Sequence, residues 1–249
     1  MTEYHILNGD VLLAQFPASI QGEKIVAREC LVDGAVSGES LDRFWKTRAE
    51  FMTSHYGVSA TEYQEKTIPE FEKIMHIPKG SRVYLWFEYD LFCQVNCWFS
   101  LSLLPGGVST FFVFPGHHDW RGFGIMDNQA LQAAYTNKQP LQEGDKSLFI
   151  ELWKYYQQDE FSALTRTANL LAGRFPKLKD TVQAHIDRFP MGKGESRPER
   201  LLAGLMHDHG KANFGPIFKK FSEEAGVYGF GDLQVKRLLD SIPGSLRNG

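Results

Sequence analysis

The chain has 249 residues, of which 43% are hydrophobic and 23% are charged, and its formal net charge is −3. This length suits one large domain or two small ones with a substantial core. Residues 174–249 carry a charge of +4 and residues 1–173 a charge of −7, a difference too small to demand nucleic acid as a partner. Three cysteines do not make a disulfide framework. Since no apolar run approaches the ~20 residues of a membrane span, we expect a soluble cytoplasmic protein without membrane contact.

The first predicted strand covers Tyr4–Leu7 and ends in Asn8-Gly9-Asp10. Apolar residues at helical spacing follow from Val11, so we expect a tight turn and then a helix with Asp10 at its start. Asp is a favourable N-cap, a helix N-terminus favours anions, and a glycine there lets the backbone approach a ligand. Asn8, Gly9 and Asp10 are therefore candidate site residues. The alternative is that Asp10 only caps its helix.

The second predicted strand, Glu23–Ala27, leads into Arg28, Glu29 and Cys30. A cation, an acid and a thiol at the exit of a buried strand are candidate site residues, with Arg28 as an anion binder and Glu29 as a ligand contact. The alternative is a salt-bridged loop with a small buried cysteine.

Two helices are expected before the next strand, the first beginning at Ser40 and the second capped by Thr61. The apolar positions of the second helix are Tyr63, Ile68, Phe71 and Ile74. Such an insertion into a βαβ pattern would cover the sheet edge or form a lid.

The third predicted strand, Val83–Phe87, ends at Glu88 and Asp90 and continues as an apolar helix from Leu91. Asp90 has the alternative role of capping this helix, whereas an acid at Glu88 has no local capping purpose. Gln94 follows Asp90 by four residues and faces the same side of the helix. We therefore predict a site at this corner between strand and helix, to which Gln94 contributes a ligand contact.

The fourth predicted strand covers Ser109–Phe114 and leaves through a polar loop that contains His117-His118-Asp119. A histidine titrates near neutral pH, so His117 is a candidate general acid or base. The alternative is an ordinary histidine in a surface loop.

From Gln129 onward the pattern is helical, and Ser196 begins a helix with Pro198 and Glu199 in its first turn. The other expected helices are Ser147–Tyr156, Phe161–Leu171, Leu178–Phe189, Phe214–Glu224 and Asp232–Ile242.

Three short helices at the C-terminal end resemble a helix-turn-helix bundle. The expected recognition helix carries only Lys236 and Arg237 as adjacent basic residues, flanked by Asp232 and Asp240. Helices that recognise DNA present more phosphate contacts, so nucleic-acid binding is the minor alternative to a structural bundle packed on the sheet.

The fold class that these elements predict is α/β: a Rossmann-like, mostly parallel sheet with helices on both faces, followed by an all-helical, helix-turn-helix-like domain. The predicted divisions are a Rossmann-like domain at 1–128, a helical connector at 129–190 and a small helical bundle at 191–249.

Several motifs occur together: His5-Ile6-Leu7-Asn8-Gly9-Asp10, Arg28-Glu29-Cys30-Leu31 with Asp33-Gly34, Leu85-Trp86-Phe87-Glu88-Tyr89-Asp90-Leu91-Phe92 with Gln94, and Gly231-Asp232-Leu233-Gln234. Together they resemble the bacterial domain-of-unknown-function family 1835, while Phe189-Pro190 and 196–200 resemble its usual C-terminal companion domain. The resemblance implies a Rossmann-like first domain, a small helical second domain and these polar clusters as characteristic positions, without an activity. Where relatives often carry Asp, this chain has Cys93.

In a parallel sheet the four strand exits lie on one carboxyl edge. Our leading hypothesis is a small-molecule hydrolase or transferase that acts there on a nucleotide or another phosphorylated or polar substrate. Asp10 and Glu88 would orient the substrate or an Mg²⁺ ion, Arg28 would bind an anion, and Asp90 or His117 would move protons.

Two other classes remain open. The chain is alternatively a ligand-sensing regulatory module whose C-terminal helices bind DNA or a protein partner, or a non-catalytic interaction protein. The pattern of residues leaves the substrate and the oligomeric state open.

Overall fold

The computed structural model describes the chain except residues 117–119, 191, 193, 210–212 and 243–249. Its sheet has the strand order β2-β1-β3-β4-β5, with the first four strands parallel and the last pair antiparallel. The strands are β1 (Glu3–Leu7), β2 (Glu23–Val26), β3 (Arg82–Trp86), β4 (Ser109–Val113) and β5 (Gln139–Pro140). The mostly parallel α/β prediction is confirmed, and β5, with two residues, is the strand that the sequence analysis did not predict.

The strand register brings the predicted exits to one edge. Leu7 of β1 lies beside Val26 of β2 and Trp86 of β3, and Trp86 lies beside Val113 of β4. The strand order reverses between β1 and β3, because the chain passes from β1 to β2 on one side and returns to β3 on the other. In open α/β sheets the crevice at such a reversal is the usual ligand position.

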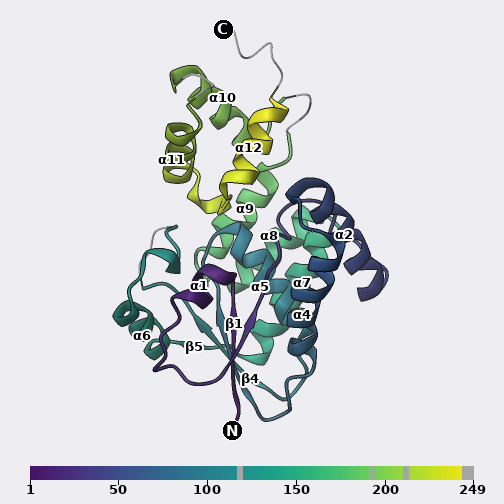
Figure 1. The fold of residues 1–249 in the computed structure, drawn as a ribbon, viewed down its shortest axis with the longest axis vertical. Helices are drawn as coiled ribbons and strands as arrows, with labels where there is room; N and C mark the ends of the chain where they lie inside the picture. The colour runs from purple at the N-terminus through teal and green to yellow at the C-terminus, as the bar shows by residue number, and fades with distance from the viewer. Residues whose placement is uncertain (117–119, 191, 193, 210–212, 243–249) are drawn as a thin grey trace.

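Helices cover both faces of the sheet, as predicted (Figure 1). One face carries the larger core, with Phe71 of α4, Val95 of α5 and Phe149 of α7 among its buried residues. Leu12 of α1, Phe123 of η1 and Leu131 of α6 belong to a smaller core on the other face. The helices around the sheet are α1 (Asp10–Ala14), α2 (Leu41–Tyr56), α3 (Ala60–Lys66), α4 (Ile68–Met75), α5 (Leu91–Leu103), η1 (Phe123–Ile125) and α6 (Asn128–Thr136).

The helix start predicted at Asp10 is confirmed, whereas the alternative that Asp10 caps this helix and the start predicted at Thr61 are wrong. The N-cap of α1 is Gly9, and Asp10 is its first helical residue, without a capping hydrogen bond. The helix expected from Thr61 is instead α3 and α4, where Ser59 caps α3 and the chain breaks at Thr67. Pro69 lies in the first turn of α4, where a backbone N–H would have no acceptor within the helix, so proline loses no hydrogen bond there.

The predicted connector forms α7 (Glu143–Gln157), α8 (Phe161–Leu171) and α9 (Leu178–Asp187). Helices α7 and α9 both contact α5, and the buried Phe149, Trp153 and Leu164 join the core on that face. These helices therefore pack against the body of the sheet domain.

The C-terminal unit, residues 196–242, comprises α10 (Arg197–His209), α11 (Phe214–Glu224), η2 (Gly226–Tyr228) and α12 (Asp232–Ser241). The predicted start of α10 is confirmed, because Glu199 accepts hydrogen bonds from the Ser196 backbone and hydroxyl in a capping box. Figure 1 shows this unit beyond the carboxyl ends of the strands, and η2 contacts α5 and α9. Among the described residues, none of the helices is long and apolar enough to cross a membrane.

Candidate functional site

Two acids occupy the corner between β3 and α5. Asp90 caps α5, since its Oδ1 accepts a hydrogen bond of 3.0 Å from the backbone N–H of Cys93. Glu88 Oε1 accepts one of 3.1 Å from the backbone N–H of Phe123. The second carboxylate oxygen, Glu88 Oε2, is buried and has no hydrogen-bond partner among the described residues. A buried oxygen of this kind is expensive unless a proton or a ligand satisfies it.

Burial dominates the protonation of both acids. Burial, and after it the charge of Glu88, raise the pKa of Asp90 from 3.8 to about 7. Burial also raises the pKa of Glu88, against the lowering influence of the nearby Cys93 thiol, the Phe123 N–H and the Asn8 amide. Near neutral pH Asp90 is therefore partly protonated, whereas an exposed Asp would be fully ionised.

Asn8 and Cys93 lie beside this pair. The Asn8 amide donates to Cys93 Sγ at 2.8 Å and accepts from the amide of Asn96 at 3.0 Å. Burial, followed by the charges of Asp90 and Glu88, raises the pKa of Cys93 well above its ordinary value, so its thiol stays protonated. The carboxyl pair thus has an amide and a neutral thiol for neighbours.

Asn96 is a site residue that the sequence analysis missed. It is fully buried on α5 and donates to Asn8 and to the backbone carbonyl of Glu29, at 3.0 and 2.7 Å. It therefore joins the ends of β1 and β2 to α5. The available signal was an amide two residues after Gln94 inside an apolar helix, where an unpaired polar group would be costly.

Gln94, a predicted ligand contact, instead binds the backbone between β3 and α5. Its amide donates to the carbonyl of Glu88 at 2.6 Å, and the residue is 4% exposed.

Asp10 and Arg28 form an ion pair nearer the surface. Arg28 Nε lies 2.8 and 2.9 Å from the two Asp10 oxygens, and its guanidinium also reaches the carbonyl of Lys66 at 3.2 Å. The hydrogen bond that Arg28 donates to Asp10 raises the pKa of Arg28. Each partner therefore already satisfies the charge that was expected to attract a metal ion or an anion.

The structure gives no additional support to a metal centre. Within the part of the chain that it describes, no three His, Cys, Asp or Glu side chains gather where they could hold an ion. The residues expected to take part, Asp10 and Glu88, belong to two different clusters, one paired with Arg28 and one beside Asp90.

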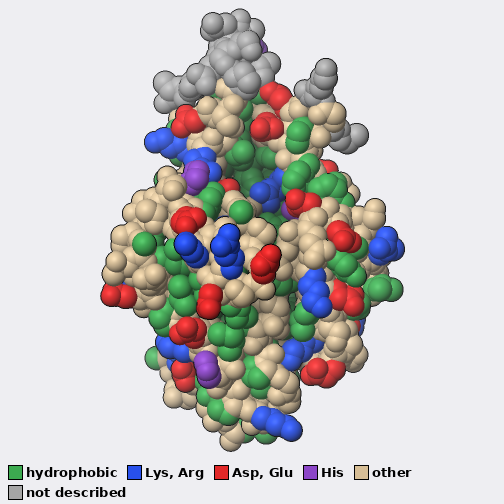
Figure 2. All heavy atoms as spheres, turned by 90° about the vertical axis from the view of Figure 1, so that its right-hand side faces the viewer, with side chains coloured by type: hydrophobic (Ala, Val, Ile, Leu, Met, Phe, Trp, Pro, Cys, Tyr) green, Lys and Arg blue, Asp and Glu red, His purple; other side chains and the backbone are tan. Residues whose placement is uncertain are grey.

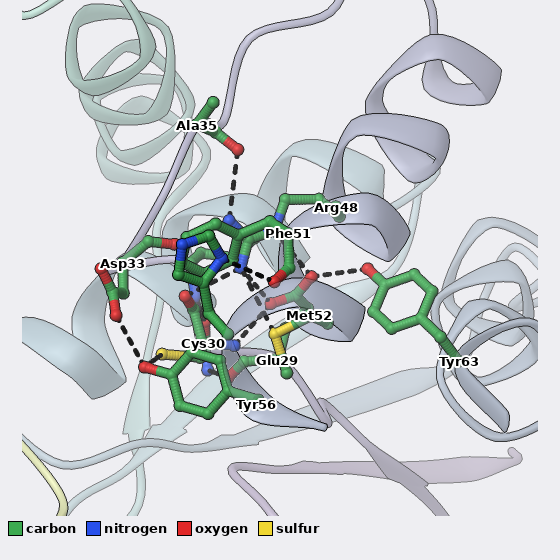
Figure 3. Close-up of polar contacts among 12 residues, drawn as sticks. Glu29, Cys30, Asp33, Ala35, Arg48, Phe51, Met52, Tyr56 and Tyr63 are labelled. Atoms are coloured by element: carbon green, nitrogen blue, oxygen red, sulfur yellow. Dashed lines mark hydrogen bonds and ion pairs between the residues drawn. The ribbon is translucent and has the colours of Figure 1, made fainter. Parts of the chain in front are cut away.

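The Glu29 side chain is fully buried and is hydrogen-bonded to Arg48 and Tyr63 (Figure 3). Arg48 of α2 donates to both of its oxygens at 2.9 and 2.8 Å, and Tyr63 of α3 donates at 2.5 Å. The Cys30 backbone N–H supplies another hydrogen bond at 2.5 Å. The Glu29 and Arg48 side chains are both 0% exposed. This arrangement matches the salt-bridged alternative for the β2 exit and leaves no carboxylate oxygen free for a ligand.

Arg48 balances the buried charge of Glu29. Burial alone would lower the pKa of Arg48, but the charge and hydrogen bonds of Glu29 raise it overall. Helical spacing alone puts Arg48 on the same face as Phe44, four residues earlier, without indicating its partner.

The C-terminal unit covers the carboxyl pair. Gly229 has a φ of +65°, and a Cβ there would lie 1.9 Å from Asp90 Oδ1. On the other side, a Cβ on Gly122 would lie 2.6 Å from Glu88 Oε1. Two glycines far apart in sequence therefore allow the backbone to close over the two acids. The sequence around a single loop glycine does not indicate which distant side chain its backbone will approach.

The structure thus brings Asn8, Glu88, Asp90 and Gln94 together at one corner. Gly9 is the residue that follows Asn8 in the chain. Asp10 and Arg28 pair beside this corner, Glu29 is turned inward, and His117 lies outside the described residues. Scans against protein-family models, curated proteins and solved structures each found no match. The function is therefore inferred from this geometry.

Proposed function

We propose that the protein is an enzyme that binds a small polar molecule at the carboxyl edge of its sheet and moves a proton with Glu88 and Asp90. The observation that carries this proposal is the buried, unpartnered Glu88 Oε2 beside a second carboxyl group. A substrate N–H or O–H group would supply the missing hydrogen bond.

The expected chemistry is general acid–base catalysis. A catalytic acid or base works best when its pKa lies near the operating pH, and the pKa of Asp90 is raised to about 7. Glu88 would contact the reacting group, while Asn8 would orient the substrate through its amide. Asp90 would act as the second proton store of the pair. Hydrolase and transferase reactions both require such proton movement.

The geometry favours a polar substrate without a phosphate group. A phosphate would meet two acids at the β3 exit and an Arg28 guanidinium that Asp10 already neutralises. A nucleotide with Mg²⁺, the other substrate class expected from the sequence, would first have to open that ion pair. We further propose that the sheet is Rossmann-like, that the chain belongs with domain-of-unknown-function family 1835, and that it acts in the cytoplasm.

A ligand-sensing regulatory module is the second candidate. Its specific support is the close approach of Gly229 to Asp90, through which a ligand at the carboxyl pair would disturb the C-terminal unit. That unit is less suited to DNA, because Gln234 and Arg237 of the expected recognition helix α12 contact Cys30 and Asp33 of the body. A protein partner is therefore the better expectation for this candidate.

Thermal unfolding in the presence of ligands tests the proposal. A ligand that binds the folded state raises the melting temperature, corresponding to RT ln(1 + [L]/Kd) in free energy. We would screen amides, sugars, nucleosides, nucleotides and Mg²⁺ against the wild type, Glu88→Gln and Asp90→Asn. Asp127→Asn is the matched control, because Asp127 caps α6 through a similar hydrogen bond of 2.8 Å but is exposed.

The expected result is a stabilising polar ligand whose effect persists in Asp127→Asn and is lost in Glu88→Gln. Turnover of that ligand should fall in both Glu88→Gln and Asp90→Asn. Binding without turnover would favour the sensing module, and no stabilising ligand at all would overturn the proposal in favour of an interaction protein.

A further inference from the structure

A separate cavity of about 290 Å³ lies between the body of the protein and the C-terminal unit. Its walls come from the loop after β2, from the end of α9 together with the start of α10, and from α12 with Phe230 just before it. Figure 2 shows a hollow below the C-terminal unit whose visible walls include hydrophobic and basic side chains. The acids of the proposed catalytic corner do not line this cavity.

Arg188, at the end of α9, is the distinctive group in the wall. It is half-buried, its Nη1 reaches the Tyr156 hydroxyl at 3.5 Å, and its guanidinium lies 5.8 Å from the centre of the Phe230 ring. No described acidic side chain forms an ion pair with it at 4.0 Å or less. A guanidinium has five N–H donors, so most of those on Arg188 are available to a ligand.

The other charged groups of the cavity are already engaged. Arg237 pairs with Asp33, which also accepts a hydrogen bond from Tyr56 at 2.7 Å. Glu199 lies in the first turn of α10, where its Oε2 accepts from the Ser196 backbone and hydroxyl at 2.8 and 2.6 Å. The positive end of the helix dipole offsets that charge. Arg188 is therefore the cation that an incoming anion would meet.

The rest of the wall is apolar. Phe189, Phe230 and Leu238 line it, and Phe189 is 38% exposed, which is high for a large hydrophobic residue. The volume lies near the lower limit of the about 300–1,000 Å³ that is usual for ligand pockets. A small organic molecule fits such a space better than a nucleotide or a peptide.

We propose that this cavity binds a small organic carboxylate, with the carboxylate on Arg188 and an apolar body against Phe230 and Leu238. Guanidinium and carboxylate groups pair through two parallel hydrogen bonds, which fixes the orientation of the ligand. The ligand would contact α9 and α12 together with Val32 of the loop after β2. It would therefore stabilise the contact between the body and the C-terminal unit.

Calorimetric titration with benzoate tests this site, because benzoate combines a carboxylate with a flat apolar ring. Benzamide is the matched neutral probe of the same shape. Arg188→Gln removes the proposed contact, and Arg200→Gln is the matched charge control, since Arg200 is exposed on α10 and does not line the cavity. Leu238→Trp fills the apolar end and keeps the test valid if Arg188→Gln does not fold.

We expect saturable binding of benzoate below about 10 mM in the wild type and in Arg200→Gln, with at least about tenfold weaker binding in Arg188→Gln, Leu238→Trp and for benzamide. Glu88→Gln should still bind benzoate, because its side chain lies outside the cavity; that variant separates this site from the catalytic proposal. Failure of benzoate to bind the wild type, or equal affinity for the wild type and both cavity variants, would overturn the proposal.

Discussion

Glu29 and Glu88 follow the ends of β2 and β3 on either side of β1, and each has a carboxylate oxygen removed from solvent. Among the described residues, a cation lies beside Glu29 but not beside Glu88. Arg48 and Tyr63 occupy both oxygens of Glu29. Glu88 has a backbone N–H on one oxygen, no described partner on the other, and a second acid, Asp90, next to it.

From this difference we infer that Glu29 is a structural acid, and we propose Glu88 as the functional one. A buried charge is tolerated when a partner compensates for its lost hydration, which Arg48 does for Glu29. No described cation compensates for the hydration that Glu88 loses on burial, and its pKa is raised as a result. Acids held in that condition concentrate at functional sites, where a ligand or a proton transfer makes use of them.

The largest expected effect is on the compensated pair. Arg48→Met leaves Glu29 as an unpaired buried charge and should lower the free energy of unfolding by about 3–5 kcal/mol. Urea unfolding monitored by circular dichroism would measure it. Arg43→Met is the control on the same helix, and because Arg43 is exposed its effect should stay below about 0.5 kcal/mol.

The double variant Arg48→Met with Glu29→Met should recover much of that loss, because it removes both charges. A double variant as unstable as Arg48→Met alone would mean that the charge of Glu29 is not the cause.

The second prediction concerns the closure over Asp90. Gly229→Ala should cost about 2–4 kcal/mol of unfolding free energy, since it combines a left-handed backbone with a collision at Asp90 Oδ1. Gly57→Ala is the matched control: its φ is +70°, but no atom lies within 4 Å of the new Cβ. It should therefore cost only the backbone term of about 1–2 kcal/mol.

Equal losses in the two glycine variants would refute the close contact between the C-terminal unit and the acid. A double-mutant cycle of Gly229→Ala with Asp90→Ala should show coupling, because the second change removes the colliding oxygen.

The third prediction uses the pH dependence of Asp90. Its pKa is raised from 3.8 to about 7 in the folded state, so the folded protein binds more protons than the unfolded chain between those values. Its contribution to stability is present at low pH and is lost as the pH rises to about 7. Asp90→Asn keeps the helix cap but cannot ionise, so it should gain about 2–4 kcal/mol relative to the wild type from about pH 4 to pH 8.

Urea unfolding across that pH range would measure this gain. The difference between Asp127→Asn and the wild type should stay nearly constant from about pH 5 to pH 8, because the exposed Asp127 is solvated in both states. A flat difference for Asp90→Asn as well would show that Asp90 is not held protonated, and the proton-transfer role of the pair would then fail.

The sequence could predict which residues reach the edge of the sheet but not what each meets there. Alternation of buried strands with helices predicts a parallel sheet, and the parallel rule then places Asn8, Glu29 and Glu88 near one edge. Glu29 and Glu88 are equivalent by that argument, because each lies just after an apolar strand.

Tertiary packing makes the environments of Glu29 and Glu88 different. Arg48 lies 19 residues after Glu29 on an inserted helix, and Gly229 lies far along the chain from Asp90. Periodicity places Arg48 on a buried face without naming its partner, and Gly229 belongs to no motif. Contacts of this kind depend on how helices dock, which a single sequence constrains only weakly.

The smallest expected effect is at the exposed end of the same edge, where Asp10 and Arg28 form an ion pair with side chains 61% and 27% exposed. Exposed pairs contribute about 0.2–1 kcal/mol, so a double-mutant cycle of Asp10→Asn and Arg28→Gln should give a coupling energy in that range. The coupling should shrink in about 1 M salt, as should that of the exposed Glu62–Lys66 pair measured for comparison. A pair this weak is one that an anionic ligand can open, so the stronger obstacle to a phosphorylated substrate is the pair of acids at the β3 exit. A coupling above about 2 kcal/mol that persists in high salt would contradict this, because a phosphate would then have to displace a partner bound as firmly as one in the protein interior.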